Sequence, residues 1–217
     1  MRTLRTAVLS CADTAQRGFR RRRMERFVRA LGIGRETRVL DIGGTMDNWQ
    51  LTSVQPRLVL LNMPRAKGEM TGATDWVAGD GRSLPFRDGA FDVVFSNSVI
   101  EHVGDAASQE RFAREVSRVG RRYWVQTPNR WFPVEQHLLT PLVHWLPKSW
   151  QRAVVRHGTV WGVLTRATAD RREFYVEHFL RDIQLLGCRE VQLLFPDARV
   201  IRERFLGVTK SLIAVRV

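Results

Sequence analysis

The chain has 217 residues, which suits one domain with an added segment, and its two cysteines, Cys11 and Cys188, lie far apart in the sequence. This cysteine usage excludes a disulfide framework and a metal-binding spacing motif, and it favours a reducing, cytoplasmic location. No apolar stretch approaches the roughly 20 residues that cross a bilayer, and the apolar part of the N-terminus, about four residues, is too short for a secretory signal.

The charge of the chain is strongly positive, since 35 Lys and Arg against 22 Asp and Glu give a net charge of +13. Such an excess indicates an anionic partner, and by this criterion alone the partner is a nucleic acid, an acidic lipid or a phosphorylated substrate. A genome composition that favours arginine over lysine would produce the same excess without any such partner.

Residues 1–34 form a basic leader in which the spacing of apolar residues predicts a helix over Gln16–Leu31, ended by Gly32 and Gly34. The apolar face of this helix is predicted to contain Met24, Phe27, Val28 and Leu31. We therefore expect a basic N-terminal helical segment, residues 1–34, followed by the main domain, residues 35–217.

Short apolar runs rich in β-branched and aromatic residues alternate with helical patterns in the main domain, which indicates an α/β fold with parallel strands joined by crossovers. A helix over Ser108–Val119 is predicted to turn Phe112, Val116 and Val119 inward, and a second helix is predicted over Glu173–Leu186. The predicted strands are Thr37–Asp41, Arg57–Leu61, Trp76–Ala78, Asp92–Ser96, Tyr123–Gln126, Val191–Phe195 and Ser211–Val217.

The alternation of strand and helix patterns stops at residues 131–169, and we predict an insertion of short helices there rather than a sheet element. Its tryptophans and leucines are mixed with Lys148, Arg152 and Arg156, a combination typical of a membrane interface. We expect a lid over an apolar or lipid-linked acceptor, and the basic leader could add about 1 kcal/mol per basic residue near an anionic surface. The alternative is an ordinary hydrophobic lid that buries its own tryptophans.

Two segments carry the strongest signals for chemistry. In Val39-Leu-Asp-Ile-Gly-Gly44, a strand ends in an acidic residue and two glycines then turn the chain, which permits close approach of a ligand to the backbone. Alone, this turn could be an ordinary tight connection between a strand and a helix. The second segment, residues 76–103, reads WVAGDGRSLPFRDGAFDVVFSNSVIEHV.

Together these segments resemble the class I S-adenosylmethionine-dependent methyltransferases, in particular the small-molecule and lipid "type 11" group with its GDxxxLPFxDxxFDxVxxxxVxEHV signature. The resemblance covers residues 35–130 and, in general layout, residues 170–217. It implies a Rossmann-like three-layer sandwich around a seven-stranded, mostly parallel sheet with one antiparallel strand. It also implies S-adenosylmethionine as cofactor and in-line methyl transfer to a small-molecule or lipid-linked acceptor, and no metal is expected.

The resemblance assigns cofactor roles to residues at the ends of the first four strands. Asp41, Gly43 and Gly44 would hold the methionine end, Asp80 with Gly81 would lie against the adenine, and Ser96 and Asn97 would border the methionine end and the substrate. Strand two departs from the pattern, because Asn62 stands where an acidic residue would grip both ribose hydroxyls. An amide accepts through one end only, so we expect cofactor binding to be weaker on the order of tenfold.

An oxygen acceptor needs a general base, and histidine is the usual choice near neutral pH. The candidate catalytic residues are His137, His102 and Glu135. His102 belongs to the signature irrespective of substrate, so its alternative role is structural. For His144, packing on an amphipathic helix is the favoured interpretation.

Two alternatives come from other functional classes. The positive charge suggests a nucleic-acid methyltransferase, but Ser96-Asn-Ser-Val-Ile replaces the Asn-Pro-Pro-aromatic run typical of base-modifying enzymes of this fold. The short glycine turn and Asn62 leave open a non-catalytic binding protein. An NAD-dependent oxidoreductase is disfavoured, because the turn has two glycines rather than three. We expect a cytoplasmic protein that contacts the inner face of an anionic membrane peripherally.

Overall fold

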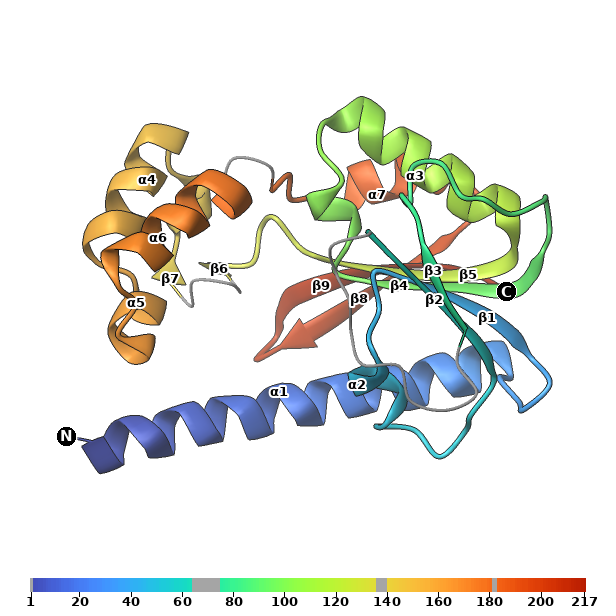
Figure 1. Cartoon of the computed structure of the whole chain (residues 1–217), viewed down its shortest axis with the longest axis horizontal. Coiled ribbons are helices and arrows are strands. Elements are labelled where there is room, and N and C mark those ends of the chain that lie inside the picture. Colours follow the sequence, from blue (N-terminus) through green and yellow to red (C-terminus); the bar gives the residue numbers. More distant parts are fainter. Residues whose placement is uncertain (1, 64–74, 136–139, 181–182) are drawn as a thin grey trace.

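A computed structural model of the chain describes residues 2–63, 75–135, 140–180 and 183–217 (Figure 1). Its centre is a seven-stranded sheet with the strand order β3-β2-β1-β4-β5-β9-β8. β9 pairs antiparallel with both β5 and β8, whereas the other pairings are parallel, so the predicted sheet with one antiparallel strand is confirmed. The strands are β1 (Arg38–Ile42), β2 (Arg57–Asn62), β3 (Asp75–Ala78), β4 (Phe91–Asn97), β5 (Gly120–Pro128), β8 (Arg199–Phe205) and β9 (Val208–Arg216).

Helices cover both faces of this sheet, which gives the three layers that the resemblance implies (Figure 1). On one face lie α1 (Arg2–Leu31) and α2 (Met46–Trp49), and on the other lie α3 (Ala106–Val119) and α7 (Cys188–Leu194). Because successive strand residues point to opposite faces, β1 contributes Val39 to the core beneath α1, and Leu40 and Ile42 to the core beneath α3. Each face therefore has its own hydrophobic core.

Helix α1 is longer than predicted, since it begins at Arg2 rather than near Gln16. Its C-terminal part buries Met24, Phe27 and Leu31 against the sheet, as the spacing predicted, and it ends at Gly32, whose φ of 58° suits glycine. The N-terminal part extends beyond the sheet on the side of the molecule where the insertion lies (Figure 1).

The insertion, residues 131–169, lies beyond the carboxyl end of β5 and contains short helices (Figure 1). It also contains a two-stranded antiparallel sheet, β6–β7, which the sequence analysis did not predict. A separate small core joins it to the segment that follows, through Val143, Val155, Tyr175, Val176 and Leu180. The elements are β6 (Val134–Glu135), β7 (Thr140–Pro141), a 3-10 turn (Val143–Trp145), α4 (Lys148–His157), α5 (Val160–Thr165) and α6 (Ala169–Tyr175).

Two sequence predictions for the C-terminal third were wrong. The run Val191–Phe195 is not a strand, because it belongs to α7 and packs Val191 and Phe195, four residues apart, into the core beneath α3. Its strand position is taken by β8, which was not predicted. The helix predicted over Glu173–Leu186 is also too long, since α6 gives way to a π-helical turn at Val176–Leu180, and residues 183–185 are not helical.

Candidate functional site

The main cavity lies at the carboxyl ends of the parallel strands, beside the point where the strand order reverses between β1 and β4. It has a volume of about 430 Å³, within the range of roughly 300–1,000 Å³ that small-molecule pockets occupy. Of the residues that the sequence analysis proposed, it brings together Gly43, Asn62, Asp80, Gly81 and His102. The turns after β1 and β3 therefore share one crevice.

Glycine is required at two points of this cavity because other atoms lie where a side chain would begin. Gly43 has a φ of 73°, and a Cβ there would lie 2.5 Å from a methyl group of Val99. A Cβ on Gly81 would lie 2.8 Å from the ring of Phe112, which belongs to α3. The two glycines therefore let these turns pack closely against Val99 and α3, which fixes the walls of the cavity.

Asp80, after β3, carries a negative charge held by Arg82. Nη2 of Arg82 donates to Oδ2 at 2.6 Å, and Nε lies 3.0 Å from both carboxylate oxygens. These bonds hold the pKa of Asp80 below its usual value. Each carboxylate oxygen can accept more than one hydrogen bond, so the pair leaves acceptor capacity for a ligand amine. Arg82 also donates to the carbonyl of Val103 at 3.1 Å, which joins two walls of the cavity.

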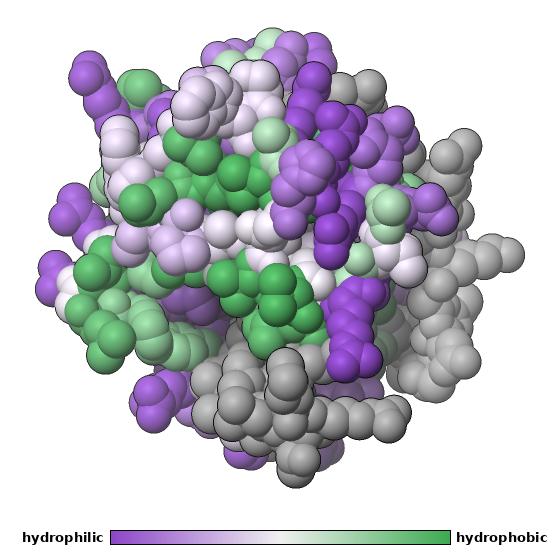
Figure 2. All heavy atoms as spheres, turned by 90° about the vertical axis from the view of Figure 1, so that its left-hand side faces the viewer, coloured by the Kyte–Doolittle hydropathy of each residue, from purple (hydrophilic) through white to green (hydrophobic). Residues whose placement is uncertain are grey.

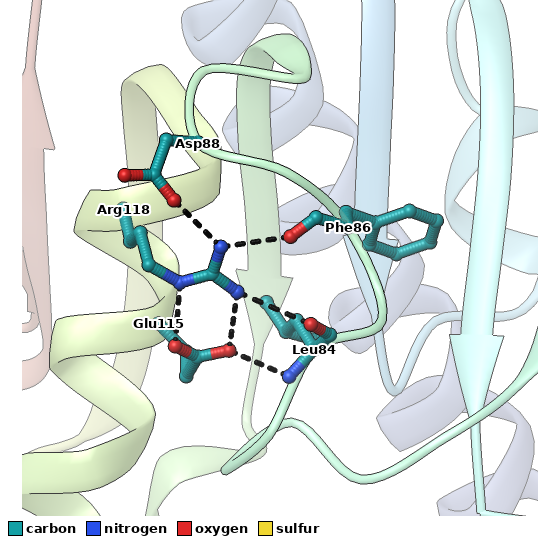
Figure 3. Close-up of polar contacts among 5 residues, drawn as sticks. All are labelled: Leu84, Phe86, Asp88, Glu115 and Arg118. Atoms are coloured by element: carbon teal, nitrogen blue, oxygen red, sulfur yellow. Dashed lines mark hydrogen bonds and ion pairs between the residues drawn. The ribbon is translucent and has the colours of Figure 1, made fainter.

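The loop that carries Asp80 is anchored by Arg118 of α3 (Figure 3). Its guanidinium donates to the carbonyls of Phe86 at 2.7 Å and Leu84 at 3.1 Å, and to the carboxylate of Asp88 at 2.8 Å. Glu115 completes the network, since it accepts from Arg118 at 2.7 Å and from the Leu84 amide at 2.6 Å. The Leu-Pro-Phe-x-Asp part of the signature therefore holds this loop against α3. We call this network of Arg118, Glu115, Asp88 and the backbone of Leu84 and Phe86 the latch.

Asn62 ends β2 and faces the glycine turn. Its amide nitrogen donates to the Gly44 carbonyl at 2.9 Å, which ties β2 to the loop after β1. The amide oxygen is then the atom that the side chain can offer to a hydroxyl of a ligand. The residue thus keeps the position of the expected acidic residue but contributes one acceptor in place of two.

Asp41 is fully buried and is not among the residues that line the cavity. Its Oδ2 accepts a hydrogen bond of 2.8 Å from the indole of Trp49 in α2, and Oδ1 has no hydrogen-bond partner among the described residues. Burial raises the pKa of Asp41 to about 8, although the indole bond opposes the shift. Gly44 is required beside it, because a Cβ there would lie 1.9 Å from Oδ2.

Ser96 and Asn97 end β4 on opposite faces of the sheet. Ser96 is buried, and its hydroxyl lies 3.4 Å from the Ile42 carbonyl of β1. Asn97 accepts a hydrogen bond of 2.5 Å from Arg23 of α1, a residue that the sequence analysis did not single out. Its position four residues from both Phe19 and Phe27 would have placed Arg23 on the inward face of the helix.

The catalytic candidates lie in two different places. His102 lines the main cavity, whereas Glu135 is buried in a second cavity of about 190 Å³ between the insertion and the segment that follows it, lined also by His144, Lys148 and Tyr175. His137 lies outside the described residues. The backbone amide of Gln184, which lines the second cavity, donates to the carbonyl of Glu101, the neighbour of His102, at 2.8 Å.

His144 is neutral by virtue of its surroundings. Its Nε2 lies 3.0 Å from the Arg130 carbonyl, which can only accept, so this nitrogen carries the proton. Burial lowers the pKa of His144 and raises that of the Tyr175 hydroxyl, so both side chains stay uncharged near neutral pH. Across the described ranges, no cluster of three His, Cys, Asp or Glu side chains has a metal-binding arrangement.

A family model described as a methyltransferase domain matches residues 30–122, a range that contains both turns of the main cavity. Similar solved structures include the protein assigned as a methyltransferase in complex with the Trm112 methyltransferase activator from Haloferax volcanii. It has a TM-score of 0.51 and 15% identity, with coverage of 94% of this chain and 93% of that one.

Two further structures have comparable scores. A protein from Rhodobacter sphaeroides, assigned as a zinc-dependent alcohol dehydrogenase, has a TM-score of 0.57, 11% identity and coverage of 89% and 87%. A protein from Nostoc punctiforme, assigned as an O-methyltransferase, has a TM-score of 0.51 and 11% identity, and the match covers 92% of this chain but 56% of that one. At such identities these likenesses show a shared fold alone, and the chemistry is indicated by the family model.

Proposed function

We propose that the chain is a class I S-adenosylmethionine-dependent methyltransferase whose acceptor is a small molecule or a lipid-linked molecule. The observation that carries the cofactor assignment is the single crevice shared by the Gly43 turn and Asp80. The acceptor proposal is supported by the insertion, which adds a polar cavity and exposed aromatic side chains next to the cofactor side of the sheet.

The residues of the main cavity fit S-adenosylmethionine. Asp80 would accept from the exocyclic amine of the adenine, while Asn62 would accept from one ribose hydroxyl. The backbone of Gly43 and Gly44 would lie along the methionine end. Asp41 lies against Gly44 and would support this turn from the buried side.

S-adenosylmethionine, when bound, supplies a reactive sulfonium methyl group, so the protein mainly has to orient the acceptor and exclude water. Orientation of this kind can contribute roughly 7–11 kcal/mol to lowering the barrier. For a hydroxyl acceptor we propose that His102 or Glu135 takes the proton, since each lines one of the two cavities. His102 is the nearer candidate to the cofactor, because it lines the main cavity itself.

Isothermal titration with S-adenosylmethionine tests the cofactor site, and Asp80→Ala should weaken binding about tenfold. Incubation with methyl-tritiated S-adenosylmethionine and extracts of the source cells then tests the acceptor class. Label that enters the organic phase supports a lipid-linked acceptor, and label in the water-soluble small molecules supports a free one. Label confined to nucleic acid would contradict the proposal.

We also propose that the insertion contacts an anionic membrane surface. Large apolar side chains are exposed there, including Trp131 and Trp150, each 65% exposed, together with Trp145. Figure 2, which shows the molecule from the insertion side, has hydrophobic patches interspersed with hydrophilic side chains. Indole rings at headgroup level and nearby cations suit such a surface. No helix in the described part of the chain is both long and apolar enough to cross a bilayer.

Co-sedimentation with vesicles tests this contact. The chain should bind vesicles that contain phosphatidylglycerol more strongly than pure phosphatidylcholine, and salt should weaken the binding. The double variant W131A/W150A should lose most of it. Leu193→Ala is the matched control, because Leu193 is 71% exposed but lies on α7. Equal binding of all variants would contradict the assignment of the surface.

A further inference from the structure

Helix α1 buries a charged side chain against the sheet. Phe19, Arg23 and Phe27 follow one another at intervals of four residues and so lie on one face of the helix. Arg23 is only 8% exposed, and its neighbours Met24 and Phe27 belong to the core beneath α1. Burial of a guanidinium destabilises the folded state unless hydrogen bonds and an ion pair compensate for the lost hydration. The contacts of Arg23 therefore indicate what its burial achieves.

The guanidinium of Arg23 joins three strands. It forms a two-pronged ion pair with Glu203 of β8, at 3.1 Å from Nε to Oε1 and 2.5 Å from Nη2 to Oε2. Its Nη1 donates to the side-chain oxygen of Asn97 at 2.5 Å and to that of Gln126 in β5 at 3.1 Å. The planar fork of arginine suits this role, since it holds several acceptors in fixed directions.

These acceptors lie at the carboxyl end of the sheet, next to the cofactor cavity. Asn97 is the last residue of β4, and the next residue, Ser98, has a φ of 57° and donates its hydroxyl to Gln126 at 3.0 Å. Val99 follows at once, lines the main cavity and lies against Gly43. A shift of Asn97 or Gln126 would therefore be transmitted directly to the wall of the cavity.

We infer that Arg23 is a positioning residue, which fixes the side chains of Asn97 and Gln126 behind the Ser98–Val99 turn that forms one wall of the cofactor cavity. The inference rests on the proposed function and extends it to α1, most of which lies outside the matched methyltransferase domain. Because the oxygen of Asn97 accepts from Arg23, its amide nitrogen is turned to serve as a donor elsewhere.

A double-mutant cycle on S-adenosylmethionine affinity tests this inference. Arg23→Met and Asn97→Ala should each weaken binding about tenfold, and the double variant should bind no more weakly than either single variant. A merely structural role for Arg23 would instead make the two effects multiply to about a hundredfold. Arg22→Met is the matched control, because the neighbouring Arg22 is exposed, and it should bind like the wild type.

Two more variants keep the test decisive if Arg23→Met folds poorly. In R23M/E203M the buried ion pair is replaced by apolar side chains, which is often neutral for stability, while the donors to Asn97 and Gln126 are absent. Arg23→Lys keeps a charge for Glu203 but lacks the fork. Both should melt near the wild-type temperature and bind the cofactor about tenfold more weakly.

Wild-type affinity in these stable variants would overturn the inference on Arg23 and leave the cofactor assignment intact. A wild-type chain that does not bind S-adenosylmethionine would overturn the cofactor assignment, and the inference on Arg23 with it. Equal loss of binding in Arg22→Met would show that the helix surface rather than the Arg23 contacts matters, and it would also overturn the inference.

Discussion

The cofactor end of the sheet and the insertion hold their side chains in different ways. Around the main cavity, glycines without room for a Cβ and a latch centred on Arg118 leave little freedom. The insertion relies on a small core of its own, and Trp131, Trp145 and Trp150 stay exposed. This difference fits the proposal that the first region binds one cofactor and that the second contacts an acceptor or a membrane surface.

The two regions also differ in how their ion pairs are built. Arg118 donates to two carboxylates and two backbone carbonyls at once. Arg156 in the insertion and its partner Glu173, just after it, are each more than 40% exposed. Exposed pairs contribute little because water competes for both charges. Substitutions of the same kind should therefore have large effects around the cavity and small effects in the insertion.

The largest contrast is expected between two glycines. Gly43→Ala combines a positive φ with a Cβ at 2.5 Å from Val99, and it should weaken S-adenosylmethionine binding about a hundredfold. Gly158→Ala, at the end of α4, meets no atom within 4 Å and should leave binding unchanged. Isothermal titration measures both, and equal affinity of the two variants would remove the contrast between the regions.

A smaller contrast is expected for the ion pairs. Arg118→Met leaves Glu115 and the carbonyls of Leu84 and Phe86 without their donor, so it should lower the free energy of unfolding by about 2 kcal/mol. Arg156→Met should leave it close to the wild-type value, because water competes for both charges of the exposed pair. Urea denaturation gives both values, and similar losses would mean that the latch contributes no more than a surface pair.

The buried carboxyl of Asp41 should make the stability of the fold depend on pH, which an exposed carboxyl would not do to the same extent. Burial raises its pKa to about 8 in the folded chain, so between about pH 4 and pH 8 the folded state binds a proton that the unfolded state has released. Stability is therefore fully present below about pH 4 and falls as pH rises to 8, by up to roughly 1.4 kcal/mol per pH unit. Asp41→Asn should remove this slope, which urea denaturation from pH 5 to 8 would reveal.

The parallel core of the fold was predictable from the sequence because its strands are short apolar runs that end at glycine or polar residues. The C-terminal third was not, because Val191–Phe195 satisfies the residue preferences of both a strand and a helix. In the structure, the Glu190 side chain accepts from the Gly187 amide at 2.6 Å, and packing against α3 completes the helix. Tertiary contacts therefore determine that this run is a helix, which its local residue pattern alone does not.

The candidate site was predictable where it depends on backbone turns and less so where it depends on side-chain direction. The shared crevice of Gly43 and Asp80 followed from the positions of the two turns. That the carboxyl of Asp41 meets Trp49 depends on which face of β1 it occupies and on α2, which no pattern indicated. Arg23 was hidden within the run Arg20–Arg23, where one of four arginines points inward.

The smallest effect on stability is expected for an exposed tryptophan of the insertion, compared with a buried tryptophan in the core beneath α1. Trp150 is 65% exposed, so Trp150→Ala should change the free energy of unfolding by less than about 0.5 kcal/mol. Trp49 is fully buried and donates a hydrogen bond to Asp41. Trp49→Ala should therefore lower the free energy of unfolding by about 3–5 kcal/mol. Urea denaturation of the two variants compares them directly. If Trp150→Ala lowered the free energy of unfolding by more than about 2 kcal/mol, its ring would stabilise the insertion and would not be free to contact a membrane surface.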